Sequence, residues 1–109
     1  MKHILHPSNK TLDLVFAGDL LSTNADQFRT EFVALLETEP LKSLKLAELR
    51  LDLTAASMID SVGLNLVVGF YKEAKKRGAK TVALIRSKNI QRTFLFTRLD
   101  AHLDIEMVA

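Results

Sequence analysis

The sequence predicts one α/β domain with a mixed, mostly parallel sheet and helices packed on it. The chain has 109 residues, 48% of them hydrophobic, which is enough to bury the core of one domain and too apolar for a disordered polyelectrolyte. Helical and strand-like patterns alternate after an initial pair of strands, which implies parallel crossovers. No linker or internal repeat interrupts the order β-β-α-β-α-β-α-β, so residues 1–109 are expected to form a single domain.

An antiparallel hairpin is predicted at the N-terminus. The short apolar patch from His3 to His6 precedes a cluster of turn-forming residues at 7–10. A second strand candidate, residues 11–17, follows this cluster and is closed by Gly18. Two short strands around a compact turn indicate an antiparallel pair.

The first helix is predicted by an apolar stripe with helical spacing. Its buried side falls at i, i+4, i+7 and i+8, at Phe28, Phe32, Leu35 and Leu36. Several candidate N-caps precede the stripe: Ser22, Thr23, Asn24 and Asp26. We expect Pro40 to end this helix, because proline lacks the N–H group that a helix interior needs.

A strand and a second helix occupy the middle of the chain. Alternating leucines predict a half-buried strand at 49–53, and a loop at 54–59 leads to a helix at 62–77. The stripe that this helix is expected to bury consists of Leu66, Val67, Phe70, Tyr71 and Ala74. Gly78 follows the last turn, where a left-handed cap is favoured.

The last third of the chain predicts a strand, a short helix and an edge strand. The apolar strand at 80–86 is of the type found in a sheet covered on both faces. Ser87 or Asn89 can cap a short helix that carries Ile90, Phe94 and Leu95. We assign Phe96 a minor core contact and residues 103–106 an edge strand.

Composition excludes several classes of protein. Without cysteine there is no disulfide framework and no thiolate metal site. Charges interrupt every apolar run before the roughly 18 residues that a membrane span needs, and no signal-peptide pattern begins the chain. A soluble, cytoplasmic protein is therefore expected.

The sequence carries no recognisable metal-binding, cofactor-binding or catalytic motif. The three histidines, His3, His6 and His102, lack metal-ligand spacing, and no nucleotide-binding or other cofactor motif is present, so no metal or cofactor is expected. A serine hydrolase would need a base beside its nucleophile. A phosphoacceptor receiver domain would need an acidic pair after its first strand. Both remain minor alternatives.

Charge is distributed unevenly along the chain. The net charge is +2, but the stretch from Lys72 to Arg98 is strongly basic and contains Glu73 as its one acid. The simplest interpretation is a solvated face, and contact with an acidic partner is the alternative. Aromatic residues are sparse and lie mostly on stripes predicted to be buried, so stacking on nucleic-acid bases is not expected.

A functional site is predicted where the loop at 54–59 leads into the second helix. The start of a helix offers free N–H groups and the positive end of the helix dipole. A phosphate on Ser61 would add about −1.5 to −2 charges and three acceptor oxygens there. The helix end would tolerate this charge, whereas a partner surface docked over it would not. The alternative is that Asp60 or Ser61 is an N-cap and nothing more.

The segment Asp60-Ser61-Val62-Gly63-Leu64 resembles the signature of STAS domains, the anti-sigma factor antagonists and their relatives. The order and spacing of the elements from residue 12 to 105 also resemble that family. The resemblance implies a STAS-like sheet, with Ser61 as phosphoacceptor, Asp60 as the preceding acid and Gly63 as the motif glycine. The residues assigned to the motif or to partner binding are Asp60, Val62, Gly63, Leu64 and Asn65.

The resemblance also implies partners. A serine kinase that is also an anti-sigma factor would bind the unphosphorylated chain and phosphorylate Ser61, and a PP2C-type phosphatase would reset the switch. The chain would then be a bacterial phosphoprotein in signal transduction and transcription regulation, a protein–protein interaction module and not an enzyme.

Two positions depart from the family pattern. Val62 replaces the usual second hydroxyl of the motif, and Leu21 stands where an acid is expected. The alternative function is therefore a divergent member of the same fold: a constitutive, stressosome-like scaffold, or an accessory regulatory subunit of a transporter or lipid-transport system. A small-ligand sensor or enzyme with this fold has no motif to support it.

Overall fold

The computed structural model describes all residues from 1 to 109, and its elements follow the predicted order. The strands are β1 (Lys2–His6), β2 (Thr11–Val15), β3 (Glu48–Leu53), β4 (Lys80–Ile85) and β5 (Asp104–Met107). The helices are α1 (Ala25–Leu36), α2 (Ser61–Lys76) and α3 (Lys88–Phe96), and a short 3-10 helix, η1, spans Leu99–Ala101.

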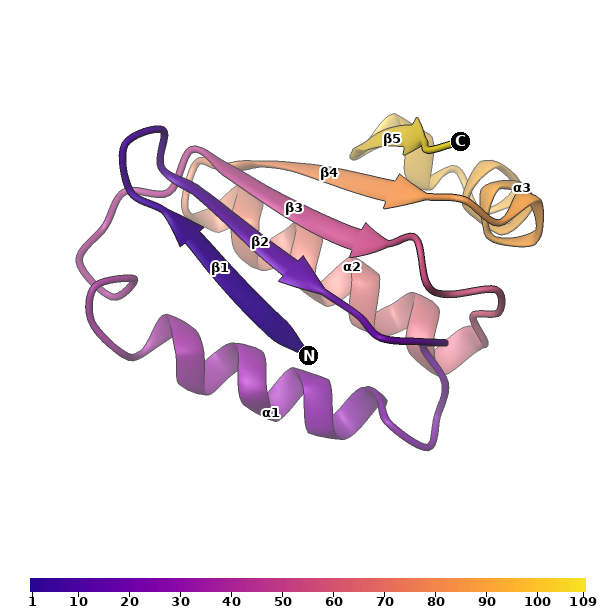
Figure 1. Cartoon of the computed structure of the whole chain (residues 1–109), viewed down its shortest axis with the longest axis horizontal. Helices are drawn as coiled ribbons and strands as arrows, with labels where there is room; N and C mark the ends of the chain where they lie inside the picture. Colours follow the sequence, from indigo (N-terminus) through magenta and orange to yellow (C-terminus); the bar gives the residue numbers. More distant parts are fainter.

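The five strands form one mixed sheet in the order β1-β2-β3-β4-β5. β1 and β2 are an antiparallel hairpin, and every other neighbouring pair is parallel. The predicted fold class is therefore confirmed. Because β2, β3 and β4 run in the same direction, their carboxyl ends share one edge of the molecule, where the loops after β2 and β3 and the start of α3 gather (Figure 1).

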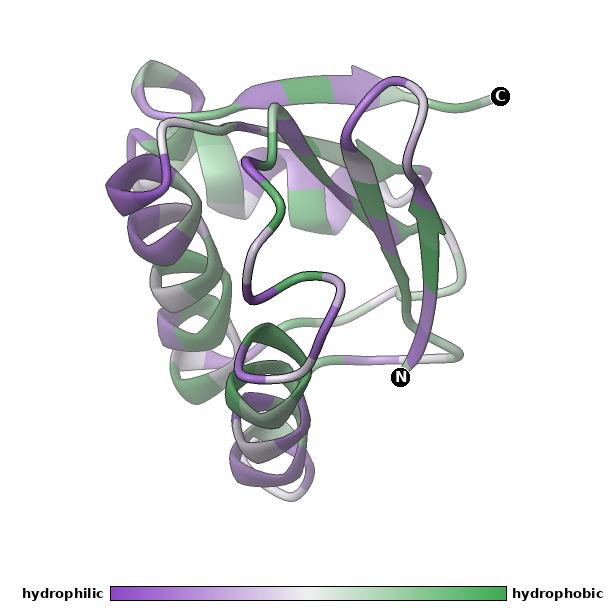
Figure 2. Ribbon diagram, turned by 90° about the vertical axis from the view of Figure 1, so that its left-hand side faces the viewer, coloured by the Kyte–Doolittle hydropathy of each residue, from purple (hydrophilic) through white to green (hydrophobic).

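The core lies between one face of the sheet and the helices. α1 and α2 lie on the same side of the sheet (Figures 1 and 2), and the leucines of β2 and β3 that face them are fully buried. Phe70 of α2 joins the layers, since its ring centroid lies 5.9 Å from that of Phe16 and 4.6 Å from that of Phe32. The buried stripes predicted for α1 and α2 are thus the sides that pack on the sheet.

The opposite face of the sheet carries no helix, so the prediction of a sheet covered on both faces is wrong. Ion pairs cross this face, from Arg50 Nη1 to Glu48 Oε2 at 3.2 Å and from Lys80 Nζ to Glu48 Oε1 at 3.2 Å. Val82 pairs with Arg50 in register on this face, yet it is only 2% exposed. Long side chains of neighbouring strands shield it, because their aliphatic stems cover apolar surface.

Helix ends match the predictions in part. Gly78 has a φ of 76°, as expected of a left-handed residue after α2. α1 ends at Leu36 rather than at Pro40, because its last turn tightens: the Thr38 N–H donates to the Leu35 carbonyl at 3.2 Å. None of the helices combines the length and hydrophobicity that crossing a bilayer demands.

Candidate functional site

Ser61 is the first residue of α2, at the edge of the molecule where the parallel strands end, and it is exposed. The N-cap is Asp60, whose Oδ1 accepts a hydrogen bond from the Gly63 N–H at 2.8 Å. This contact satisfies one of the free donors of the first turn and leaves the Ser61 hydroxyl without a capping role. The N-cap interpretation is therefore correct for Asp60 and does not account for Ser61.

Asp60 also ties two loops together. Its second oxygen, Oδ2, accepts a hydrogen bond from the backbone N–H of Ser22 at 2.7 Å, across 38 residues of sequence. The hydrogen bonds from the Gly63 and Ser22 N–H groups lower the pKa of Asp60 below its ordinary value of 3.8. An ionised carboxylate whose two oxygens are both engaged is a weak proton acceptor, so Asp60 is poorly suited to act as the base for Ser61.

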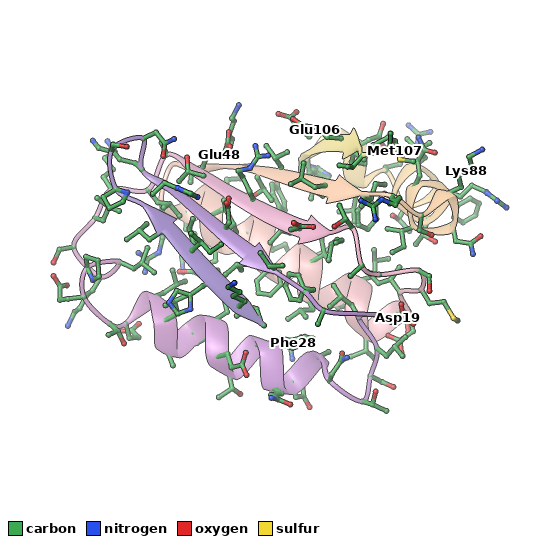
Figure 3. All side chains as sticks on the ribbon, in the orientation of Figure 1. Asp19, Phe28, Glu48, Lys88, Glu106 and Met107 are labelled. Atoms are coloured by element: carbon green, nitrogen blue, oxygen red, sulfur yellow. The ribbon has the colours of Figure 1, made fainter.

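Asp19 makes the reciprocal connection from the loop after β2. Its Oδ1 accepts hydrogen bonds from the backbone N–H groups of Ser57 and Met58, at 2.8 and 3.0 Å. These two bonds lower the pKa of the Asp19 carboxyl below its ordinary value. Figure 3 shows Asp19 at the same edge as Lys88, at the opposite end of the sheet from Glu48.

Asp19 had no assigned role in the sequence analysis. An aspartate after a strand and a glycine is typical of turns in which the side chain binds backbone N–H groups nearby. That pattern could have marked Asp19 as structural, but its partners lie 38 and 39 residues away and no local signal identifies them.

Gly63 is required by the close approach of the two loops. Leu20 forms an isolated parallel bridge with Ile59, and the Leu20 carbonyl accepts a hydrogen bond from the Asp60 N–H at 3.2 Å. A Cβ at position 63 would overlap the carbonyl oxygen of Leu20 and lie 2.6 Å from its carbonyl carbon. Only glycine fits there, and the backbone that approaches it belongs to the chain itself.

The other motif residues lie along the first turns of α2. Val62 and Asn65 are exposed, whereas Leu64 is half-buried and packs against the core. The motif thus presents Ser61, Val62 and Asn65 to solvent and directs Gly63 and Leu64 inward. Their assignment to partner binding stays a prediction.

An apolar groove of about 780 Å³ lies between α3 and the loop that joins β3 to α2. Its exposed apolar side chains are Met58 from the loop and Leu95 and Phe96 from α3, which are 59%, 49% and 90% exposed. The predicted core contact of Phe96 is therefore wrong. α3 buries the side that carries Ile90 and Phe94, and a residue two positions after Phe94 points about 160° away from that side.

The part of the basic stretch that lies at the end of α2 is far from Ser61. Lys72 and Arg77 follow Ser61 by 11 and 16 residues on or just after the same helix, a separation of about 16 to 24 Å at 1.5 Å per residue. The cation that lines the groove near Met58 is Arg92 of α3. A phosphate on Ser61 would therefore not fold back onto the basic end of α2.

Comparisons with known proteins agree with this geometry. The family model of the STAS domain matches residues 5–108. Three solved structures share the fold. A protein described as a candidate anti-sigma factor antagonist from Thermotoga maritima is 19% identical, with a TM-score of 0.79, and the match covers 98% of this chain and 86% of that one.

The anti-sigma factor antagonist SpoIIAA, in its unphosphorylated form, is 17% identical with a TM-score of 0.71, over 99% of this chain and 88% of that one. An anti-sigma factor antagonist from Mycobacterium paratuberculosis is 18% identical with a TM-score of 0.76, over 98% and 86% of the two chains. No curated protein matches the sequence. Because the family model spans nearly the whole chain and the fold agrees, the chain belongs to the STAS domain family.

Proposed function

We propose that the chain is a phosphorylation-switched protein-interaction module of the anti-sigma factor antagonist type. It would bind a partner that is both a serine kinase and an anti-sigma factor while Ser61 carries a free hydroxyl. The observation that carries the proposal is the exposed Ser61 hydroxyl at the start of α2, beside an aspartate already committed to capping.

In the proposed modification, Ser61 Oγ attacks the γ-phosphorus of ATP bound to the kinase. The new O–P bond replaces the bond to ADP, which leaves, and the hydroxyl proton passes to a base. Because both carboxylate oxygens of Asp60 accept backbone hydrogen bonds, we assign that base to the kinase. A PP2C-type phosphatase restores the serine: water attacks the phosphorus, the bond from Ser61 Oγ to phosphorus breaks, Oγ takes up a proton and inorganic phosphate leaves.

Phosphorylation would act on binding through charge and desolvation. A phosphate carries about −1.5 to −2 charges at neutral pH, and here it would lie next to the carboxylate of Asp60. The positive end of α2 stabilises this anion in solvent. A partner docked over Ser61 would have to remove water from both anions, so the modified surface would release it.

The apolar groove at the loop that precedes Ser61 supports a protein partner. Met58, Leu95 and Phe96 are large, exposed and close to one loop, which is typical of interaction sites rather than of scattered surface residues. A partner that covers Ser61 together with this loop would bury these side chains as well.

The modification is tested by incubating the chain with the cognate kinase and ATP and locating the phosphate by mass spectrometry. We expect one phosphate on Ser61 and none on the Ser61→Ala variant. Ser22, an exposed hydroxyl on the neighbouring loop, supplies the matched control, because Ser22→Ala should be phosphorylated like the wild type. A phosphate elsewhere, or none, would refute the proposal.

Partner binding is tested separately with variants that leave the core intact. Ser61→Asp and Phe96→Ala should each weaken binding about tenfold or more, a loss of about 1.4 kcal/mol or more. Val33 on α1 is an exposed apolar residue on another element, 54% exposed, so Val33→Ala should bind like the wild type. Equal binding by all four proteins would contradict the proposed surface.

A constitutive scaffold or accessory subunit is the second candidate function. Val62 and Leu21 favour it, since the first removes a hydroxyl from the motif and the second removes an acid from the facing loop. In that case Ser61→Ala and Ser61→Asp would bind the partner equally well. A difference of tenfold between them would instead support the switch.

A further inference from the structure

Three lysines of the basic stretch, Lys72, Lys75 and Lys76, line a concave site near the end of α2 that is distant from Ser61. A pocket of about 740 Å³ opens between α2 and the segment around η1. This volume is within the range of small-molecule sites, about 300 to 1,000 Å³. The lining residues are Val68, Tyr71, Lys72, Lys75, Lys76, Thr97, Leu99 and His102, with no carboxylate among them.

Hydrogen bonds orient part of this wall. The Tyr71 hydroxyl lies 3.4 Å from His102 Nδ1 and accepts a hydrogen bond from Lys75 Nζ at 3.5 Å. The Tyr71 and His102 rings lie with their centroids 5.4 Å apart, and the Lys75 ammonium is 5.9 Å from the Tyr71 centroid. The ammonium group of Lys75 is thus held at the pocket and not extended freely into solvent.

Two of the three lysines have no opposite charge to neutralise them. Lys76 lies 3.8 Å from Glu73, which also pairs with Arg77 at 3.5 Å. Lys72 and Lys75 form no ion pair within the chain. A concave surface with uncompensated positive charge concentrates anions from solution.

We propose that this pocket binds a compact polyanion, a small molecule with two or more adjacent phosphate groups. Ammonium groups bind phosphate as point charges that adapt to its position. The Tyr71 hydroxyl supplies a polar contact beside these ammonium groups, and the pocket is larger than one phosphate needs.

The surroundings disfavour an extended anion such as a nucleic acid or an anionic membrane. The adjoining hollow shares Tyr71, Lys75 and His102 with the pocket, and besides Lys80 it exposes the carboxylates of Asp100 and Asp104. An extended anionic surface laid over Lys75 would meet these carboxylates, whereas a compact ligand would not. The proposal does not depend on phosphorylation of Ser61.

The test is isothermal titration calorimetry of the full chain with tripolyphosphate and, in a second arm, with ATP. The variant Lys72→Gln/Lys75→Gln removes both unpaired charges from the pocket. The matched control Lys42→Gln/Lys45→Gln removes the same charge from exposed positions in the loop before β3. We expect about tenfold or greater loss of tripolyphosphate affinity in the first variant and less than about twofold in the second.

Binding of tripolyphosphate but not ATP would identify the polyphosphate chain as the recognised group, and tighter binding of ATP would add its nucleoside. No binding of either at millimolar concentration would overturn the proposal. So would equal losses in both double variants, which indicate general screening by net charge. Tighter binding to an oligonucleotide or to phosphatidylglycerol vesicles, lost in Lys72→Gln/Lys75→Gln, would overturn it in favour of a macromolecular surface.

Discussion

The two glycines of α2 are in opposite environments although they lie six residues apart in one helix. Gly63 is buried against the Leu20 carbonyl, and Gly69 has nothing within 4 Å of the position of a Cβ. We predict that Gly63→Ala destabilises the protein by about 3 kcal/mol, the upper range for overpacking, because backbone has to move. Gly69→Ala should stabilise it by about 0.8 kcal/mol, since alanine is the better helix former.

Urea denaturation of the two glycine variants checks this prediction. The identical substitution serves as its own control, because the chemical change is the same at both positions. Equal midpoints for Gly63→Ala and Gly69→Ala would contradict the packing of α2 on Leu20.

Arg98 has a φ of 62°, in the left-handed region that favours glycine. This conformation destabilises the folded state by about 1 to 2 kcal/mol for an L-residue compared with glycine. Glycine, however, has more conformational freedom in the unfolded chain, which offsets about 0.4 to 1 kcal/mol of that difference. We therefore predict that Arg98→Gly stabilises the protein by about 0.5 to 1 kcal/mol. Arg92→Gly, inside α3, should instead destabilise by about 1 kcal/mol. Thermal unfolding of both variants tests the sign, and a lower midpoint for Arg98→Gly would be the contrary outcome.

At the scale of elements, the two aromatic residues of α3 lie in opposite environments. Phe94 is 0% exposed and belongs to the core, whereas Phe96 is 90% exposed. Phe94→Ala should cost about 3 to 5 kcal/mol, as large-to-small core substitutions do. Phe96→Ala should change stability by less than about 0.5 kcal/mol.

The free energies of unfolding of these α3 variants, measured in denaturant, separate packing from interaction. If Phe96→Ala were as destabilising as Phe94→Ala, Phe96 would be a core residue and could not be assigned to a docking surface. A stable Phe96→Ala protein makes a change in partner binding interpretable.

At the scale of the whole molecule, two aspartates join loops that follow different strands. Asp19 accepts hydrogen bonds from the loop after β3, and Asp60 accepts one from the loop after β2. The folded protein lowers the pKa of both carboxyls. A carboxyl whose pKa is lower in the folded than in the unfolded state stabilises the protein above its ordinary pKa of 3.8, and this stabilisation is lost as pH falls through the folded value.

We therefore predict that stability falls as the pH drops below about 4 and that the aspartates contribute to this loss. Asp60→Asn should be less stable at pH 7 and should lose less of its remaining stability on acidification, because asparagine cannot be protonated in this range. Urea midpoints at pH 7, 5, 4 and 3 test this. A variant with the same acid-induced loss as the wild type would contradict the role of Asp60.

Several levels of structure were predictable from the residues. The order of elements, the antiparallel hairpin, the parallel crossovers and the left-handed Gly78 follow from local patterns, because periodicity and turn residues depend on neighbours in sequence. The position of Ser61 at the start of α2 was predictable for the same reason.

The errors concern features that depend on distant residues. β4 is apolar on both sides, yet no helix covers one of them (Figure 2). Val82 on that side is buried all the same, beside side chains of neighbouring strands. Phe96 is apolar in a short helix, yet it points outward, because the core lies on the side of Phe94. A helix of nine residues has too few turns for hydrophobic periodicity alone to show which of its residues face the core.

The sequence by itself determined the elements, the fold class and the serine at the start of a helix, since hydrophobic spacing, capping residues and turn formers act over a few residues. Only the tertiary structure decided what surrounds that serine. The hydrogen bonds of Asp19 and Asp60, the contact of Gly63 with Leu20 and the groove beside Phe96 all join segments distant in sequence. Such contacts form when the parallel strands bring their ends to one edge, and no local pattern encodes them. The lysine pocket, at the other end of α2, likewise depends on tertiary structure, because it joins α2 to the segment around η1.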